Sequence, residues 1–172
     1  MGVGVTGIVA ATVMVRDLTR SARWYCEVLD LRFIREFTVD GTVWGVVLHD
    51  QDADFVIVLQ DLSTVPGVRD LHGSRPLVLK APSRETVEKL AGRFARLGLD
   101  PRGPVTDPDG TAVDIVDPDG IVLRVRHVTS PPDTGFQGVA YDADNTVTGT
   151  YTTPALDVPT PSSVSPSNTD DV

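Results

Sequence analysis

Residues 12–33 read TVMVRDLTRSARWYCEVLDLRF, a stretch that predicts a strand, a helix and a second strand in succession. Small and β-branched residues dominate the segment 8–16, which is typical of a β-strand. Apolar side chains recur at helical spacing over about 19–29, which predicts a helix there. Asp17 is a favourable N-cap for this helix. A further strand, over about 32–39, follows that helix.

The same order of elements occurs twice along the chain. Three strands are expected after the first helix, and a linker that contains residues 62–75 then leads to a second series of one strand, one helix and three strands. Ser83 is the expected N-cap of the second helix and Gly98 its end. The expected strands are 8–16, 32–39, 42–49, 54–60, 76–81, 101–105, 111–116 and 121–127, and the expected helices are 19–29 and 84–97. The pattern β-α-β-β-β, repeated, predicts an α+β fold of two modules.

A change of composition near residue 130 predicts two parts of unequal character. Residues 1–128 form one domain, with modules at about 8–60 and 76–127, and residues 129–172 form a tail rich in Pro, Thr, Ser and Asp. The tail contains six Asp but no Lys, Arg, Glu or His. A segment of this kind buries too little apolar surface to offset the entropy of ordering, so we expect a largely disordered tail.

Disorder is expected above all beyond about residue 153. The stretch 135–152 allows two interpretations, because its apolar and aromatic side chains either dock on the domain or belong to a linker. These side chains are Phe136, Val139, Tyr141 and Tyr151.

The composition excludes several classes of protein. A net charge of −9 disfavours nucleic-acid binding, where phosphate contacts dominate affinity. No segment approaches the roughly 18 consecutive apolar residues of a membrane helix. Cys26 is the single cysteine of the chain, which excludes an internal disulfide and a cysteine-based zinc site. We therefore expect a cytoplasmic protein without membrane or nucleic-acid partners.

Three motifs occur in this order along the chain: VRDLTRSARWY at 15–25, EVLDLRF at 27–33 and DPDGIVLRV at 117–125. Their order and spacing resemble the vicinal oxygen chelate superfamily, which includes glyoxalases, bleomycin-resistance proteins and extradiol dioxygenases. Residues 15–25, VRDLTRSARWY, are similar to that family's V-x-D-L-x-x-S-x-x-F-Y. Residues 27–33, EVLDLRF, are similar to its following L-G-F segment, with Asp30 in the usual place of glycine. Residues 117–125, DPDGIVLRV, are similar to its closing D-P-D-G hairpin.

The resemblance implies an architecture and a mode of assembly. In that family the modules form a curved mixed sheet whose concave face encloses a small-molecule pocket, and the helices pack on the outer face. The two modules of a pocket come from one chain or from two swapped chains, and the sequence leaves that choice open. The resemblance therefore implies a small organic ligand and a homodimer as partners.

The resemblance also implies where a catalytic metal would lie, and the residues there are unsuitable. Enzymes of the family hold a divalent ion on four side chains, typically His and Glu. Those positions fall on Ala10, on Leu59 or Gln60, on Pro76 and on Arg124. Three of these residues offer no donor atom or repel a cation, so we expect no metal and no other cofactor.

Strand alternation predicts the lining of the pocket. If Ala10 and Arg124 face inward, so do their alternate neighbours, and Val113 is expected opposite Arg124. Trp44 is expected on the inner face with Thr42, Val46 and Leu48, although core or dimer packing remains an alternative. An acidic ligand group would pair with Arg124 or Lys80, unless these cations only reach solvent at the rim. The predicted ligand-binding residues are Thr12, Met14, Trp44, Val58, Gln60, Val78, Lys80, Val113, Arg124 and Arg126.

These observations favour a metal-free binding protein, similar to the bleomycin-resistance type, that sequesters an antibiotic or another aromatic or acidic metabolite. One alternative is a lyase, isomerase or dioxygenase with a displaced metal site or an acid–base mechanism. That mechanism would use Asp114, Gln60, Lys80 or His49. A second alternative is a regulatory module whose cleft is filled by the tail or a partner. Enzymatic activity stays open but is disfavoured, and no catalytic residue is assigned.

Overall fold

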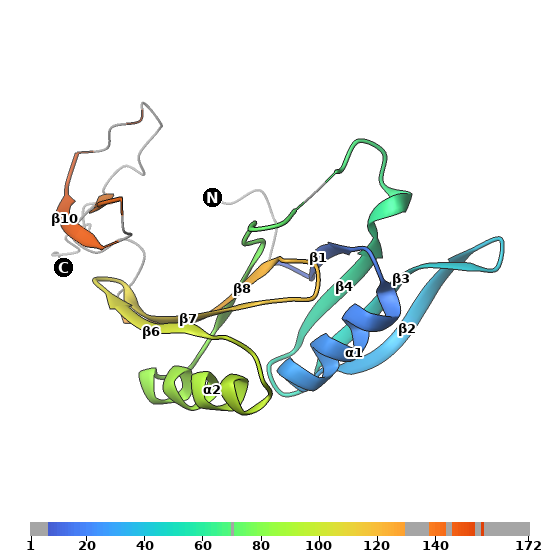
Figure 1. The fold of residues 1–172 in the computed structure, drawn as a ribbon, viewed down its shortest axis with the longest axis horizontal. Coiled ribbons are helices and arrows are strands. Elements are labelled where there is room, and N and C mark those ends of the chain that lie inside the picture. Colours follow the sequence, from blue (N-terminus) through green and yellow to red (C-terminus); the bar gives the residue numbers. More distant parts are fainter. Residues whose placement is uncertain (1–6, 70, 130–137, 144–145, 154–155, 157–172) are drawn as a thin grey trace, which may run out of the picture. The chain divides into compact units, whose positions relative to one another are not determined.

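The computed structural model describes residues 7–69, 71–129, 138–143, 146–153 and 156. The chain divides into two compact units, residues 1–130 and 131–172. Every element of the two predicted modules lies in the first unit (Figure 1). Its strands are β1 (Ala10–Val15), β2 (Arg32–Val39), β3 (Thr42–Asp50), β4 (Phe55–Asp61), β5 (Leu77–Lys80), β6 (Arg102–Asp107), β7 (Gly110–Val116) and β8 (Val122–Val128), and its helices are α1 (Leu18–Leu29), η1 (Leu62–Thr64) and α2 (Arg84–Arg96).

The two modules have the same sheet topology. The first sheet has the strand order β1-β4-β3-β2 and the second β5-β8-β7-β6. In each sheet one pair is parallel, β1 with β4 and β5 with β8, and the remaining pairs are antiparallel. Two four-stranded mixed sheets with one α-helix each confirm the predicted α+β fold of repeated modules.

Each α-helix begins at its predicted cap and covers one face of its own sheet (Figure 1). The Asp17 side chain accepts a hydrogen bond from the Arg20 backbone N–H, and the Ser83 hydroxyl accepts one from that of Thr86. The two helices place Tyr25 and Phe94 fully inside the core. Of the adjacent aromatic pair on α1, Tyr25 is therefore the core residue, and Trp24 is only half-buried.

Polar contacts join the modules where the β7–β8 turn (residues 117–121) meets α1. The Tyr25 hydroxyl donates to the Asp117 carboxylate at 3.0 Å, and the Ser21 hydroxyl donates to that of Asp119 at 3.3 Å. The Arg16 guanidinium also lies 3.4 Å from Asp119. At the other end of α1, Arg93 of α2 donates to the Glu27 backbone carbonyl at 2.8 Å. Side-chain contacts thus tie α1 to the second module at both ends.

The linker between the modules packs on the same turn. The Gly73 backbone N–H donates to the Gly120 carbonyl at 2.7 Å, and the Val122 N–H donates to the Ser74 carbonyl at 2.8 Å. Gly120 has a φ of +83°, and a β-carbon there would meet the His72 ring at 2.1 Å. The turn therefore requires glycine both for its backbone conformation and for the room that His72 occupies.

The second unit contains a hairpin that the sequence reasoning did not predict. Strands β9 (Gly138–Tyr141) and β10 (Val147–Tyr151) pair antiparallel, with Val139 opposite Thr150. Of the aromatic residues in the ambiguous stretch, Tyr141 and Tyr151 belong to these strands, and Phe136 lies outside the described residues. The predicted disorder beyond residue 153 also falls almost wholly outside the described part of the chain. No described helix is long and apolar enough to cross a membrane.

Replacing Tyr25 by Phe should lower the free energy of unfolding by about 1–3 kcal/mol, because a buried carboxylate loses a hydrogen-bond donor. Chemical denaturation followed by circular dichroism measures this difference. Tyr141→Phe, at a half-exposed hydroxyl in β9, is the matched control and should leave stability almost unchanged. Equal effects of the two substitutions would show that the junction contact does not stabilise the fold.

Candidate functional site

The inner face of the first module is the side of its sheet that α1 does not cover. Strand pairing sets Thr12 beside Val58 and Met14 beside Gln60, and sets Val58 opposite Val47. The alternate residues of β1 and β4 are fully buried on the helix side, namely Val13, Val15, Ile57 and Leu59. The predicted inward orientation of the β1 and β4 residues therefore agrees with the sheet.

A β-bulge in β3 corrects the expected orientation of that strand. Phe37 pairs with Gly45 and Thr38 with Val43, so Trp44 is an extra residue between two ladder positions. The bulge keeps Trp44 on the inner face but reverses the alternation after it. The expectation for Val46 and Leu48 was wrong, because both are buried on the helix side, with 5% and 0% of their surfaces exposed.

The rings of Phe37 and Trp44 form the most prominent feature of the inner face. They stack with centroids 5.1 Å apart and an interplanar angle of 22°. A cavity of about 450 Å³ lies on one side of the pair and one of about 380 Å³ on the other. The first is lined by Val39, Thr42, Trp44, Gln60 and Thr64, and the second by Ile34, Arg35, Phe37, Val47, His49, Val56 and Val58. We call these two sets of lining residues the aromatic face.

Several residues of the aromatic face were absent from the sequence-based prediction. Strand β2 contributes Phe37 to the aromatic face, and the part of β3 after the bulge contributes Val47 and His49. The signal that would have found them is Gly45, because a glycine inside a strand often marks a bulge or a close approach. A β-carbon at Gly45 would lie 3.2 Å from the Leu59 carbonyl oxygen and 3.4 Å from the Phe37 ring, so the backbone of β4 approaches this position more tightly than the ring does.

The inner face of the second module has a different chemical character. The Arg124 guanidinium donates twice to the Asp114 carboxylate, at 2.7 and 2.8 Å. Arg126 makes a similar two-point contact with Asp107, one bond of which measures 2.9 Å. Carboxylates of the same module already bind both guanidinium groups. An anionic ligand would therefore have to compete with Asp114 or Asp107 for these arginines.

The ion pair of Asp107 with Arg126 affects ionisation. Burial alone would raise the pKa of Asp107. Hydrogen bonds from Arg126 and from the backbone N–H groups of Asp109 and Gly110, together with the charge of Arg126, outweigh burial and hold that pKa below its ordinary value. The ionised pair is therefore the stable form at neutral pH.

The position predicted for Val113 was wrong. Val113 pairs with Val125, and Asp114 pairs with Arg124. The β7–β8 turn sets this register, because Val116 opposes Val122 across five intervening residues. The Val113 side chain consequently points into the core beneath the sheet, with 1% of its surface exposed.

The remaining predicted residues lie apart from the aromatic pair. Val78 and Lys80 on β5 are exposed, Val78 to 56%. Met14 borders a void of about 10 Å³ beside Leu71 and Ile121. Trp44, Val58 and Gln60 are thus the predicted residues that line the two cavities of the aromatic face.

The positions that the family resemblance assigns to a metal do not fit one. Ala10 and Pro76 carry no donor atom, and Arg124 is a cation engaged with Asp114. Gln60 offers a neutral amide that donates to the Thr64 hydroxyl at 3.3 Å. In the described part of the chain, no group of three or more His, Cys, Asp or Glu residues is arranged to hold a metal ion.

Comparison with protein-family models matches residues 7–125 to the Glyoxalase/Bleomycin resistance protein/Dioxygenase superfamily. A search of curated proteins finds no match. Among solved structures, the chain is similar to TnmS3, an antibiotic binding protein from Streptomyces sp. CB03234, with 21% identity, a TM-score of 0.62, and coverage of 74% of this chain and 100% of that one.

The chain is similar to further solved structures. A glyoxylase/bleomycin resistance protein/dioxygenase domain from Frankia sp. EAN1pec has 24% identity and a TM-score of 0.59, over 73% of this chain and 100% of that one. A lactoylglutathione lyase from Agrobacterium tumefaciens has 18% identity and a TM-score of 0.58, over 72% and 95%. At these identities the likeness shows a shared fold and leaves the activity open.

Replacing Asp107 by Asn should destabilise the protein by about 1–3 kcal/mol at neutral pH, because Arg126 loses its charged partner. A carboxyl whose pKa is lowered by folding contributes stability above its unfolded pKa and loses it as pH falls through the folded pKa. The difference between the two proteins should therefore shrink as pH falls from about 5 to about 2. Urea denaturation across this range measures it.

Asp109→Asn is the matched control for this prediction. The Asp109 carboxylate is 3.9 Å from Arg126 and 42% exposed, so its removal should cost less. A gap between wild type and Asp107→Asn that is constant with pH would contradict the assigned role of the ion pair.

Proposed function

The chain belongs to the glyoxalase/bleomycin resistance protein/dioxygenase superfamily, and we propose that it is a metal-free binding protein for a small, flat organic molecule. The aromatic face carries this proposal. A stacked aromatic pair between two cavities offers a ligand ring both stacking and apolar contact. The valines of β3 and β4 extend the apolar surface beneath it.

The polar groups around the aromatic face define the ligand further. Arg35 and His49 line one cavity, and Gln60 and Thr64 line the other. Arg35 forms no ion pair with the described residues, in contrast to Arg124 and Arg126 of the second module. We propose that Arg35 binds an acidic group of the ligand, in place of Arg124 or Lys80, which the sequence analysis named for that role.

Sequestration of an antibiotic is the role that this binding chemistry supports best. An antibiotic binding protein has the same fold, and sequestration needs tight binding without any bond-forming step. The proposal places the protein in the cytoplasm, where it would bind such a compound before the compound reaches its target. An enzymatic role would require an acid–base group beside the ligand. Asp114 is held by Arg124, which leaves His49, 3.4 Å from the carboxylate of Asp54, as the candidate for the enzymatic alternative.

A flat anionic aromatic compound should quench the fluorescence of Trp44. In the Trp24→Phe background, where Trp44 is the only tryptophan, titration with an anthraquinone sulfonate should give saturable quenching. Replacing Arg35 by Met should weaken that binding about tenfold, since a charge-assisted contact is lost. Arg102→Met, at an exposed position of β6, is the control and should leave the affinity unchanged.

Three results would argue against this function. The first is an absence of quenching by both the anthraquinone sulfonate and bleomycin up to millimolar concentration. The second is chemical conversion of the bound compound, seen by mass spectrometry, which would favour the enzymatic alternative. The third is near-stoichiometric retention of manganese, iron, nickel or zinc after desalting.

We further propose that two copies of the chain associate. Strand β2 is an edge strand of its sheet and exposes Phe33 to 54%, Ile34 to 42% and Val39 to 61%. An apolar edge strand of this kind favours pairing with another chain. A second copy would also cover the open side of the aromatic face.

Light scattering coupled to size exclusion should therefore give a mass about twice the chain mass of 18.4 kDa. The double substitution Phe33→Lys and Val39→Lys should shift the protein to a monomer, because it places charges on the proposed contact. Val105→Lys, at a similarly exposed position of β6, is the control and should leave the dimer intact. A monomeric wild-type protein at all accessible concentrations would exclude the dimer.

A further inference from the structure

A separate cavity of about 500 Å³ lies between α1 and the β7–β8 turn. It is on the helix side of the first sheet, and its lining shares no residue with the aromatic face. One wall is formed by α1 and the other by the turn of the second module. The lining residues are Asp17, Thr19, Arg20, Arg23, Trp24, Glu27, Val116, Asp117 and Pro118.

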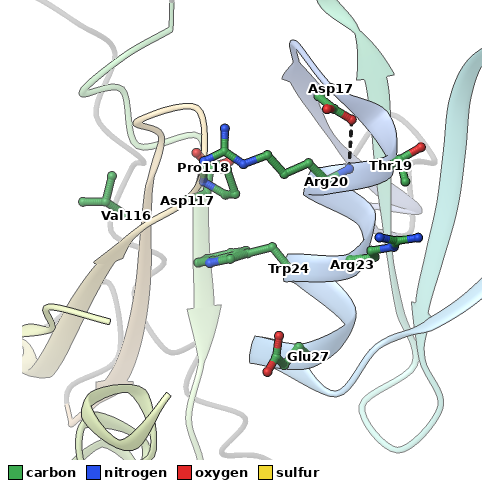
Figure 2. Close-up of a pocket in the computed structure, with 9 residues that line it drawn as sticks. All are labelled: Asp17, Thr19, Arg20, Arg23, Trp24, Glu27, Val116, Asp117 and Pro118. Carbon is green, nitrogen blue, oxygen red and sulfur yellow. Dashed lines mark hydrogen bonds between the residues drawn. The ribbon is translucent and has the colours of Figure 1, made fainter. Parts of the chain in front are cut away.

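Two of these side chains extend from α1 toward the turn. Figure 2 shows the Arg20 side chain and the Trp24 indole both directed at the segment that carries Asp117 and Pro118, while Thr19 and Arg23 point to the other side of the helix. The Trp24 ring makes an edge contact with Tyr25, with centroids 5.0 Å apart and an interplanar angle of 71°. Because Tyr25 is fixed in the core, this contact orients the indole before any ligand arrives.

Arg20 is the cationic side chain of this cavity that extends toward the turn, and the lining also carries Arg23 and the carboxylates of Asp17, Glu27 and Asp117. The Asp17 carboxylate already caps α1, and the Asp117 carboxylate accepts hydrogen bonds from Tyr25 and from backbone N–H groups. Among the described residues no carboxylate forms an ion pair with Arg20, unlike Arg124 and Arg126 on the inner face. A guanidinium beside an aromatic ring, with no internal counter-ion, is suited to a carboxylate on a flat ring.

We propose that this cavity is a second binding site, specific for a small aromatic carboxylate. The ligand ring lies against the Trp24 indole and the apolar surface of Val116 and Pro118. Its carboxylate pairs with the Arg20 guanidinium. The volume falls within the range of pockets that hold small organic molecules. Because the walls come from both modules, an occupied site also links α1 to the β7–β8 turn.

The test uses para-trifluoromethylbenzoate, observed by fluorine NMR with the full-length protein. The benzoate should bind saturably, and the neutral para-trifluoromethylbenzamide should bind about tenfold more weakly, since it lacks the charge that pairs with Arg20. Arg20→Met should weaken benzoate binding by a similar factor. Arg96→Met removes an exposed guanidinium from α2 and should have no effect, which controls for the change in net charge.

The two tryptophans separate this site from the aromatic face. In the Trp44→Phe variant the benzoate should still bind and should still perturb the remaining fluorescence of Trp24. In the Trp24→Leu variant binding should be lost, with folding checked by circular dichroism. If that variant fails to fold, the Arg20→Met comparison alone decides.

Three outcomes would overturn the proposal. They are no benzoate binding up to millimolar concentration, equal affinity for the benzoate and the benzamide, and binding that depends on Trp44 but not on Arg20. Failure of the anthraquinone titration at Trp44 would leave this proposal unaffected, because the two sites share no residue.

Discussion

The buried hydrogen bond between Tyr25 and Asp117 is the interaction on which the arrangement of the first unit depends. Burial is the main reason that the pKa of Tyr25 and that of Asp117 both lie above their ordinary values. The negative charge of Asp117 raises the pKa of Tyr25 further. The Asp117 carboxylate also accepts hydrogen bonds from the backbone N–H groups of Asp119 and Ile121. One side chain therefore both stabilises the turn and binds α1 of the other module through Tyr25. A change at either partner would leave a polar group without its hydrogen bond inside the core.

This contact gives two of the recognised motifs a structural reason that is independent of catalysis. Ser21 and Tyr25 belong to the first motif, and Asp117 and Asp119 belong to the last. Across the junction, Ser21 contacts Asp119 and Tyr25 contacts Asp117. The motifs therefore specify how the modules dock, whereas any metal chemistry would be specified by single positions on the strands. Ala10, Pro76 and Arg124 are not among the four residues of these two contacts. The family membership of the chain is thus compatible with unsuitable side chains at the positions that the resemblance assigns to a metal.

The sequence predicted the parts of the fold that depend on local patterns. Apolar spacing and caps located both helices, and alternation located the eight strands of the modules. Strand alternation failed to predict which side chains face inward where the pattern is interrupted. The bulge at Trp44 reverses the faces of Val46 and Leu48. The strand register pairs Val113 with Val125, one residue away from the expected partner, and its side chain lies in the core. The pairing of Arg124 with Asp114 was not predictable from composition, since it depends on which residues the strand register places side by side. The β9–β10 hairpin was missed because its segment is poor in the long apolar side chains that mark a strand.

The unequal chemistry of the two inner faces bears on how a ligand would be held. A ligand that used Arg124 would have to separate a two-point ion pair, and among the described residues the Asp114 carboxylate would then retain its ion pair with Arg75, 3.5 Å away. No such cost arises at the aromatic face, where Phe37, Trp44 and the valines present apolar surface that gains by leaving water. Binding energy should therefore come mainly from the first module, and the ion pairs of the second module should act as a fixed polar wall. Under the proposed function, a site of that kind holds a ring by stacking and apolar contact, and sequestration requires no bond-forming step.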